Sequence, residues 1–367
     1  MLTKFTVSNY RGFKEPTTLD LSHPRDYSFN TEYVTNGVVT NALIIGPNAS
    51  GKSNLLSALV DIRTNFFAPG NSFGPIDADE GFLNANSMLQ EATFEYEFLF
   101  DGARVLYRYA KAADRGIKEE VLSLNDKIVF DYSVKDGLRD SNLGLIDAQS
   151  LNWTFSDEYS SALAYVSSNA PVQKNGVLDR LRSFTSGITR ATHDGWNSPR
   201  VLDGYVREII KKDKVLELEE FLNGFGINEK LMVREGADGS RSIYCKHTRP
   251  IPLALCISSG TRTLLSLFVF YRLRSRAMYL LDEFDAYCHF ELAENLLRFF
   301  GSTPECQTIC TTHNTSLTRN GVMRPDCIFK FGDDGSLRAL SDRTDRELGF
   351  GSNVERLLRN GERGMCL

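Results

Sequence analysis

Residues 41–62, NALIIGPNASGKSNLLSALVDI, decide the fold of this chain. Within this stretch, residues 46–53 match G-x-x-x-x-G-K-[ST], the pattern of a phosphate-binding P-loop. The apolar run 42–45 before the loop is typical of a buried parallel strand. Apolar residues after the loop recur at helical spacing, namely Leu55, Leu56, Leu59 and Ile62. A strand, a glycine loop and a helix in this order predict a nucleotide-phosphate site.

Each part of this loop has a chemical task. The glycines let backbone N–H groups turn toward phosphate oxygens, and the helix N-terminus adds a partial positive charge. Lys52 is predicted to reach the two terminal phosphates, and the Ser53 hydroxyl to hold Mg²⁺. The residues predicted to bind the nucleotide are therefore Gly46, Pro47, Asn48, Ala49, Ser50, Gly51, Lys52, Ser53 and Asn54.

The composition is that of a folded globular protein. Of 367 residues, 42% are hydrophobic and 24% are charged, so one large or two ordinary domains are expected. The net charge of -5 argues against a chain built wholly around nucleic acid, although it leaves room for a local basic face.

The cysteines and the N-terminus indicate where the protein works. Seven cysteines are scattered at 245, 256, 288, 306, 310, 327 and 366 without a C-x-x-C pair. This spacing predicts neither a structural zinc site nor a disulfide scaffold, and free thiols suit a reducing cytosol. Residues 1–13 lack the apolar core of a signal peptide, and no apolar run reaches about 18 residues. A cytoplasmic protein without a membrane span is expected.

Hydrophobic patterning divides the chain into three parts. Residues 1–84 and 250–367 read as a discontinuous α/β head that contains the P-loop. Residues 85–150 alternate with period two and predict an antiparallel β lobe of about four strands. Residues 151–249 predict a mainly helical insert without a long coiled coil. The expected fold class is therefore an α/β P-loop NTPase with an antiparallel β lobe and an inserted helical lobe.

Two acids follow an expected core strand. Residues 277–281 are apolar, and Asp282 and Glu283 come directly after them, which is the Walker B arrangement. An acid at the end of a core strand lies near the P-loop, so Asp282 is assigned to Mg²⁺. Glu283 is then placed to orient and deprotonate the attacking water, and it is the predicted general base.

Two further segments can contact phosphate. Ser258, Ser259 and Gly260 precede an expected helix, where their hydroxyl and N–H groups either bind an anion or cap that helix. Their position about 22 residues before Asp282 favours the anion site. His313 follows a short β-branched strand, and from there it can donate to a γ-phosphate as a catalytic sensor.

The order of these motifs resembles an ABC-type ATPase head of the SMC/RecF kind. Residues 5–15, 280–292 and 353–364 further resemble the compact AAA-family ATP-binding proteins of the overcoming-lysogenisation-defect (OLD-like) type. The resemblance covers roughly 1–62 and 250–361, and the middle fits only by its β-then-helical order. Members of this group are frequent in antiphage defence operons, beside a separately encoded effector.

The resemblance implies an ATPase that uses ATP and Mg²⁺ and works as a head-to-tail homodimer. Each ATP would lie between the P-loop of one subunit and residues 258–260 of the other. Asp285 would contact the opposite subunit, and Gln90 is the nearest candidate for the metal-binding glutamine of the Q-loop. The expected partner is an effector protein, while higher oligomers and nucleic-acid binding stay open and no membrane is expected.

Two positions depart from the usual pattern of the group. Thr261 stands where Gln or Glu is usual, and Phe290 stands where Pro commonly follows His. Neither change removes a phosphate ligand, but slow turnover is expected. The chain ends about fifty residues after His313, so a C-terminal Toprim nuclease is not expected.

Three functions compete at this point. The first is a switch ATPase that controls a partner in antiphage defence. The second is a DNA-repair ATPase of RecF or SMC character, which the acidic net charge disfavours. The third is the nucleotide-binding subunit of a membrane transporter, which Thr261 and the stretch Asn9–Phe13 disfavour.

Overall fold

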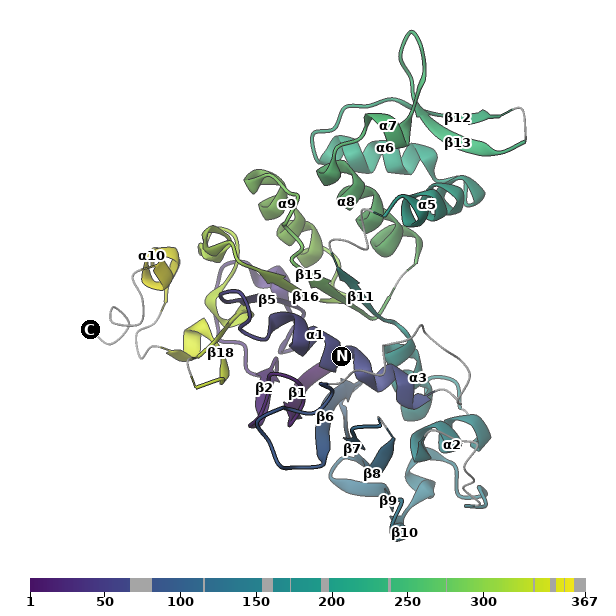
Figure 1. Cartoon of the computed structure of the whole chain (residues 1–367), viewed down its shortest axis with the longest axis vertical. Coiled ribbons are helices and arrows are strands. Elements are labelled where there is room, and N and C mark those ends of the chain that lie inside the picture. The colour runs from purple at the N-terminus through teal and green to yellow at the C-terminus, as the bar shows by residue number, and fades with distance from the viewer. Residues whose placement is uncertain are drawn as a thin grey trace.

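Two β-sheets organise the molecule (Figure 1). The computed structural model describes all residues except 67–80, 115, 154–160, 172, 193–197, 237–238, 275, 333, 344–347, 353 and 360–367. The glycines and prolines of residues 66–84 predict a loop, and this segment lies mostly outside the described residues. The molecule is elongated, with a β-hairpin at one end and the outermost strand of the larger sheet at the other (Figure 1).

The six-stranded sheet carries the P-loop. Its strand order is β11-β15-β16-β5-β17-β18, and only β18 is antiparallel to its neighbour. Every residue of β5, β15 and β16 is buried, which explains the apolar runs 42–45 and 278–281. Strand β16, QTICTT, is buried as well although it is rich in threonine. The strands are β5 (Asn41–Ile45), β11 (Ile188–Thr192), β15 (Met278–Asp282), β16 (Gln307–Thr312), β17 (Ile328–Phe331) and β18 (Leu337–Ala339).

The helices beside this sheet begin where the sequence motifs lie. Helix α1 (Lys52–Asp61) contacts β11 and β15 of this sheet and β1 of the other, so it lies between the two sheets. Helix α8 (Ser259–Phe268) continues into a π-helical turn, η4 (Val269–Leu273), and α9 (Phe290–Gly301) follows β15. The parallel strands and their connecting helices confirm the predicted α/β P-loop fold.

The seven-stranded sheet is wholly antiparallel, in the order β10-β9-β8-β7-β6-β1-β2. The predicted meander is present and has one strand more than expected. One face is lined with buried aromatic rings, including Phe94, Tyr96, Phe98, Tyr107 and Tyr109. The strands are β1 (Leu2–Ser8), β2 (Thr17–Asp20), β6 (Glu91–Phe100), β7 (Ala103–Ala112), β8 (Ile117–Leu124), β9 (Lys127–Ser133) and β10 (Gly137–Ser141).

The region between β10 and α8 is mostly helical, as its apolar stripes predict. It contains α2 (Ala162–Asn169), α3 (Val177–Ser186), α5 (Pro199–Lys211) and α6 (Val215–Gly224). A small sheet follows, with β12 (Leu231–Glu235), β13 (Arg241–Cys245) and β14 (Ile251–Pro252), and then α7 (Leu253–Cys256). The small sheet and α7 form the tip of the molecule that is uppermost in Figure 1.

Short elements complete the described chain. The polar composition of residues 23–40 predicts a loop, but the segment holds a 3₁₀ turn and a two-stranded ladder. Tyr33 anchors it, because this side chain is buried and donates its hydroxyl to Val322 O. The elements are η1 (Thr31–Tyr33), β3 (Val34–Thr35), β4 (Val38–Val39), η2 (Ile62–Phe66), η3 (Leu143–Ile146), η5 (Thr315–Thr318), η6 (Pro325–Cys327), η7 (Leu340–Arg343) and α10 (Val354–Arg359).

The sheets cross the boundaries of the three predicted segments. Strands β1 and β2 pair into the same sheet as β6–β10, and β11 pairs with β15 although it lies within residues 151–249. The three-segment division therefore stays a prediction, and the antiparallel lobe and the head share strands. Across the described ranges, no helix is both long enough and apolar enough to cross a membrane.

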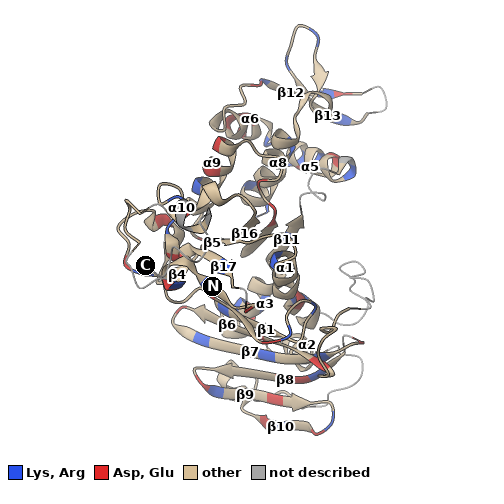
Figure 2. Cartoon of the chain, turned by 60° about the vertical axis from the view of Figure 1, so that its left-hand side comes forward, with Lys and Arg blue, Asp and Glu red and all other residues tan. Residues whose placement is uncertain are grey.

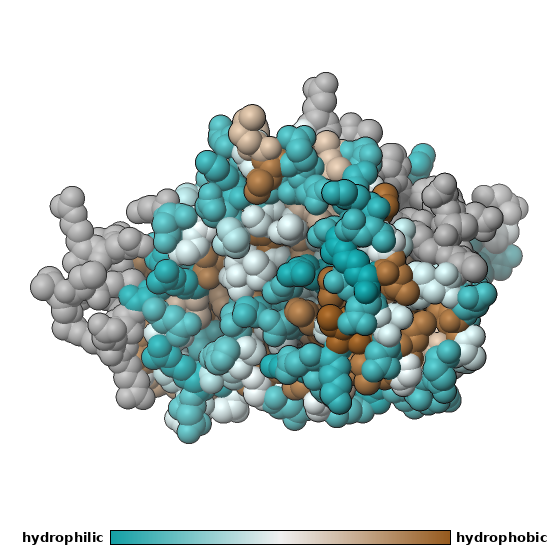
Figure 3. All heavy atoms as spheres, turned by 90° about the horizontal axis from the view of Figure 1, so that it is seen from below, coloured by the Kyte–Doolittle hydropathy of each residue, from teal (hydrophilic) through white to brown (hydrophobic). Residues whose placement is uncertain are grey.

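The surface carries charges of both signs. Figure 2 shows Lys and Arg alternating with Asp and Glu on the antiparallel sheet and on the helical end. Seen from the end where β10 lies, hydrophilic side chains cover most of the face, and apolar side chains form smaller patches among them (Figure 3).

Candidate nucleotide-binding site

The backbone of the P-loop needs its two glycines. A Cβ atom on Gly46 would lie 2.7 Å from Ser50 Oγ, and one on Gly51 would lie 3.0 Å from the Phe13 ring. Gly51 also has a φ of 103°, which side chains rarely tolerate. The loop tip, residues 47–49, is exposed. The loop thus presents backbone groups to solvent at the edge of the sheet where the parallel strands end.

Lys52 is folded into this loop. Its Nζ donates to Gly46 O at 2.9 Å and to Pro47 O at 2.8 Å, and the residue is buried. Burial lowers the pKa of Lys52, and the charges of Glu283 and Asp282 oppose that shift. A phosphate bound to the loop would replace the two carbonyl oxygens as the partner of the Lys52 ammonium. This exchange requires only a short movement of one flexible side chain.

Ser53 and Asp282, both predicted to bind the metal, lie together. Ser53 Oγ donates to Asp282 Oδ1 at 3.0 Å, and Thr311 Oγ1 donates to the same oxygen at 2.7 Å. Arg190 Nη2 donates to the other oxygen, Oδ2, at 3.0 Å. Only 9% of the Asp282 side chain is exposed, so these three partners hold the carboxylate in one orientation.

Sequence reasoning did not identify Arg190 or Thr311. Arg190 lies on β11, where it is paired with Leu280 of β15, and this parallel pairing brings it to Asp282. Arg190 also lines a cavity of about 500 Å³ together with residues of α1 and α5. No local pattern could have shown this contact, since β11 falls in a stretch whose composition is helical.

Glu283 is directed away from the partners of Asp282. Its backbone is left-handed, with a φ of 48°, and its N–H donates to Thr311 Oγ1 at 2.8 Å. Its carboxylate lies 3.6 Å from His313 Nε2, and both side chains are partly exposed. A non-glycine residue in this conformation costs about 1–3 kcal/mol, and such residues cluster at functional sites. The structure thus brings both predicted catalytic residues together.

Asp285 is held within its own chain. Its Oδ2 accepts a hydrogen bond from Thr312 Oγ1 at 2.8 Å. Burial raises the pKa of Asp285, while hydrogen bonds from Thr312 and Asn314 oppose that shift. The expected contact of this carboxylate with an opposite subunit stays a prediction.

Both readings of residues 258–260 find support in the local geometry. Ser258 caps α8, because its Oγ accepts from Thr261 N–H at 3.1 Å and lies 2.9 Å from Thr261 Oγ1. Ser258 and Ser259 are nevertheless exposed, whereas a Cβ atom on Gly260 would lie 3.1 Å from Tyr287 O. The cap and an exposed pair of hydroxyls therefore coexist at this helix start.

Gln90 and Asn54 lie in different surroundings. Gln90 is exposed, and its Nε2 donates to Met88 O at 3.0 Å, so its metal-binding role stays a prediction. The Asn9 side chain ties this loop to the N-terminal strand by donating to Leu89 O at 2.9 Å. Asn54 Nδ2 would lie 3.3 Å from a Cβ on Gly12, so the N-terminal turn packs against the P-loop helix.

ATP and Mg²⁺ fit the residues that are present. Two glycines leave the loop open to phosphate oxygens, and Ser50 Oγ is buried without a hydrogen-bond partner in the part of the chain that the structure describes. Ser53 and Asp282 offer the hydroxyl and carboxylate oxygens that Mg²⁺ prefers. Lys52 supplies the positive charge.

Three solved structures are similar to this chain, each at low sequence identity. No curated protein matches the chain. The SMC head domain from Thermotoga maritima is 17% identical with a TM-score of 0.46, over 92% of this chain and 97% of that one. An SmcHead bound to the C-winged helix domain of ScpA is 14% identical with a TM-score of 0.48, over 92% and 96%. A Pyrococcus furiosus Smc head with an extended coiled coil, bound to the C-terminal domain of ScpA, is 13% identical with a TM-score of 0.48, over 93% and 97%.

The match to a family model decides the assignment, because it covers more than half of the chain. The family is described as an AAA domain, putative AbiEii toxin, Type IV TA system, and its model matches residues 42–319. This range contains the P-loop, residues 258–260, both Walker B acids and His313. The match confirms the resemblance to AAA-family ATPases that the motif order indicated, and the chain belongs to this family of AAA domains.

Proposed function

We propose that this chain hydrolyses ATP as a switch, dimerises head-to-tail around ATP and thereby controls a separately encoded effector. The observation that carries the proposal is the arrangement of the two Walker B acids. Asp282 faces Ser53 of the P-loop, while Glu283 faces His313 with its carboxylate partly exposed. This arrangement supports a metal-binding role for Asp282 and a water-activating role for Glu283.

The side chains divide the chemistry among them. Lys52 neutralises charge on the terminal phosphates, and Ser53 and Asp282 would hold Mg²⁺ between them. When bound, Mg²⁺ neutralises the charge that develops on the β- and γ-phosphate oxygens. Glu283 orients the attacking water and accepts its proton, and His313, 3.6 Å away, positions this carboxylate and donates to the γ-phosphate.

The proposed dimer rests on residues 258–260. Ser258 and Ser259 are exposed, and the hydrogen bonds of Ser258 Oγ stay within the first turn of α8. A helix N-terminus with exposed hydroxyls suits the γ-phosphate of an ATP held by a second chain. We expect two such contacts per dimer, related by twofold symmetry.

The proposed biological role is the control of an effector in antiphage defence, in the cytoplasm. The family description, which names a putative toxin of a Type IV TA system, supports a role beside a partner protein. A DNA-repair ATPase has less support, because the net charge is -5 and both signs of charge are mixed along the elements (Figure 2). A transporter subunit is the remotest alternative.

The test separates binding from hydrolysis. Glu283→Gln keeps size and hydrogen bonding but removes the proton acceptor, so ATP should bind, the dimer should accumulate and turnover should fall by about 10² to 10⁴. Asp282→Asn should instead weaken Mg²⁺-dependent binding. Glu291→Gln is the matched control, because Glu291 is an exposed acid on the first turn of α9. Steady-state hydrolysis and light scattering with ATP measure both effects.

Three results would contradict these assignments. Hydrolysis at the wild-type rate in Glu283→Gln would exclude this residue as the general base. A protein that stays monomeric with ATP would exclude the switch. Loss of ATP binding in Glu283→Gln would mean that the roles of the two acids are reversed.

The effector can be sought with the same variant. We expect the ATP-bound Glu283→Gln dimer to retain a protein encoded next to this chain in a pulldown from cells that express both. Residues 85–250 are the proposed partner surface, so deleting α5 and α6 should abolish retention. A pulldown that recovers recombination proteins and DNA instead would favour the DNA-repair alternative.

A further inference from the structure

A second cluster of chemically active side chains lies at the tip of the molecule, away from the P-loop. One oxygen of Glu229, the sulfur of Cys245 and one nitrogen of His247 lie within 4.8 Å of one another. The three residues surround one end of the β12–β13 ladder. Carboxylate, thiolate and imidazole are all metal ligands. None of these three residues belongs to the candidate nucleotide-binding site.

The ladder explains how these residues meet. Strand β12 pairs Leu231 with Cys245 of β13, and one step further Lys246 N–H donates to Lys230 O at 2.7 Å. The chain then turns, because His247 N–H donates to Cys245 O at 3.2 Å. This turn brings His247 Nε2 to 3.4 Å from Glu229 Oε2.

A second thiol lies beside Cys245, although its sulfur is not among the three ligand atoms that lie within 4.8 Å of one another. Strand β14 pairs Ile251 with Cys245, and α7 begins directly after β14 and ends at Cys256. As a result, Cys256 Sγ lies 2.8 Å from Cys245 Sγ, and both are free cysteines. Cys245 is buried, whereas Cys256 is exposed, so an ion can reach the pair from solvent.

We propose that Cys245, Cys256, His247 and Glu229 bind a divalent zinc ion. Two sulfurs, one nitrogen and one oxygen are the number and kinds of ligand that tetrahedral Zn²⁺ takes in proteins. Thiolate and imidazole together favour Zn²⁺ over the hard cations Mg²⁺ and Ca²⁺. On binding, each cysteine releases its thiol proton to solvent and forms one sulfur–zinc bond, so the two thiolates balance the charge of the ion.

The zinc proposal departs from the expectation based on the absence of a C-x-x-C pair, because the fold brings together ligands that are distant in sequence. The ligands come from three places: the segment before β12, the end of β13 with the turn that follows it, and the end of α7. Only Cys245 and His247 are close in sequence. A search for paired cysteines cannot identify Glu229 and Cys256, because their approach to Cys245 depends on the pairing of β13 with β12 and β14.

The ion would also fix the start of α8. Cys256 precedes Ser258, the N-cap of α8, by two residues. A bond from Cys256 to the ion would tie this junction to the β12–β13 hairpin and restrict its movement. Zinc should therefore raise the melting temperature of the protein, a result that is independent of whether the chain hydrolyses ATP.

The test uses the full chain purified without a polyhistidine tag. Elemental analysis should find about one zinc per chain, and removal by a chelator followed by Co²⁺ should give the visible bands of tetrahedral Co²⁺ and a thiolate charge-transfer band. The Cys245→Ser, Cys256→Ser double variant should lose the zinc and the charge-transfer band. Cys288→Ser is the matched control, since Cys288 lies outside the cluster and should leave both unchanged.

If the double variant fails to fold, a change at an exposed ligand, His247, still tests the proposal. His247→Gln should weaken zinc binding by at least about tenfold, the least that loss of a supporting partner alone costs. His23→Gln, an exposed histidine beside Asp20, is its control. Retention of zinc in the double variant, or equal zinc affinity in His247→Gln and His23→Gln, would overturn the proposal. A chain that takes up no zinc and carries a Cys245–Cys256 disulfide under reducing conditions would overturn it as well.

Discussion

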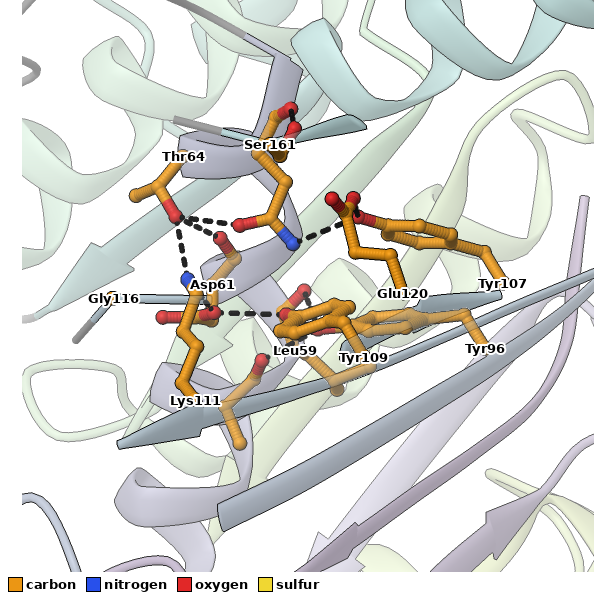
Figure 4. A network of polar contacts seen from close by, with 12 residues as sticks. Leu59, Asp61, Thr64, Tyr96, Tyr107, Tyr109, Lys111, Gly116, Glu120 and Ser161 are labelled. Atoms are coloured by element: carbon orange, nitrogen blue, oxygen red, sulfur yellow. Dashed lines mark hydrogen bonds and ion pairs between the residues drawn. The ribbon is translucent and has the colours of Figure 1, made fainter. Parts of the chain in front are cut away.

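Replacement of Lys111 tests how the P-loop helix is anchored. Helix α1 begins at Lys52 and ends at Asp61, and Asp61 lies in a buried polar network beneath β7 (Figure 4). Asp61 Oδ2 accepts from Lys111 Nζ at 2.5 Å and from Tyr109 Oη at 2.8 Å. Lys111 Nζ also donates to Thr64 Oγ1 at 2.8 Å. Lys111 and Asp61 are only 4% and 11% exposed, so solvent screens this pair weakly.

Lys111→Met keeps the length of the side chain and removes its charge. Asp61 would then be a buried carboxylate that has lost its positively charged partner and keeps the hydrogen bond from the Tyr109 hydroxyl. Breaking one side of a buried pair costs about 3–5 kcal/mol of the free energy of unfolding. With an unfolding entropy of about 2.1 cal/mol/K per residue, a chain of this length should melt about 4–6 °C lower.

The double variant measures the pair itself. Asp61→Asn combined with Lys111→Met leaves no uncompensated charge, so it should lose less than the sum of the two single changes. Urea unfolding and thermal melting at pH 7 provide both quantities. Lys118→Met is the matched control, because the pair of Lys118 on β8 with Asp114 in the preceding turn is exposed and should contribute less than about 1 kcal/mol. Equal losses in Lys111→Met and Lys118→Met, or strict additivity in the double variant, would refute the argument.

Three further changes test separate parts of the molecule. Lys52→Ala should abolish ATP binding in calorimetry, and the exposed Lys14→Ala should not, because only Lys52 lies in the P-loop. Burial raises the pKa of Glu120 from 4.5 to about 7. The contribution of this group to the free energy of unfolding is therefore complete below about pH 4.5 and is lost as pH rises through 7. Unfolding measured from pH 5 to 8 should show this slope, and Glu120→Gln should lack it. Thr311→Val should lower hydrolysis while Thr311→Ser retains it, since the hydroxyl fixes both Walker B acids; equal rates would contradict this role.

The parts of the fold that could be predicted from sequence are those with local signals. Strand β5 before the P-loop and strand β15 have apolar runs because they are buried on both faces, and the polar residues after each run mark the edge of the sheet. Strand β16 is marked by its β-branched residues. The meander β6–β9 shows its period of two because one face is packed with aromatic rings. Glu283 and His313 could be identified because each directly follows such a strand.

The parts that could not be predicted depend on pairing between distant segments. Arg190 contacts Asp282 across 92 positions of sequence, and β1 pairs with β6 after a separation of more than eighty residues. Strand β11, ITRAT, has neither an apolar run nor a strong alternation, so nothing local marks it as a neighbour of β15. The proximity of Cys256 and Glu229 to Cys245 likewise could not be predicted from sequence, because it depends on the pairing of strands in the small sheet.

The end of β16 joins three motifs that the sequence presents separately. Consecutive residues of this strand and its exit contact three different acids: Thr311 donates to Asp282 at 2.7 Å, Thr312 donates to Asp285 at 2.8 Å, and His313 lies 3.6 Å from Glu283. The parallel register that pairs Leu281 with Cys310 places these residues side by side.

Because three neighbouring residues hold three acids, the acids cannot move independently of β16. A contact between His313 and a γ-phosphate would displace the same short segment that fixes Asp282 and Asp285. We therefore expect that the metal ligand, the general base and the proposed interface acid respond to nucleotide together. In a His313→Gln variant, the three responses should weaken in parallel rather than one at a time.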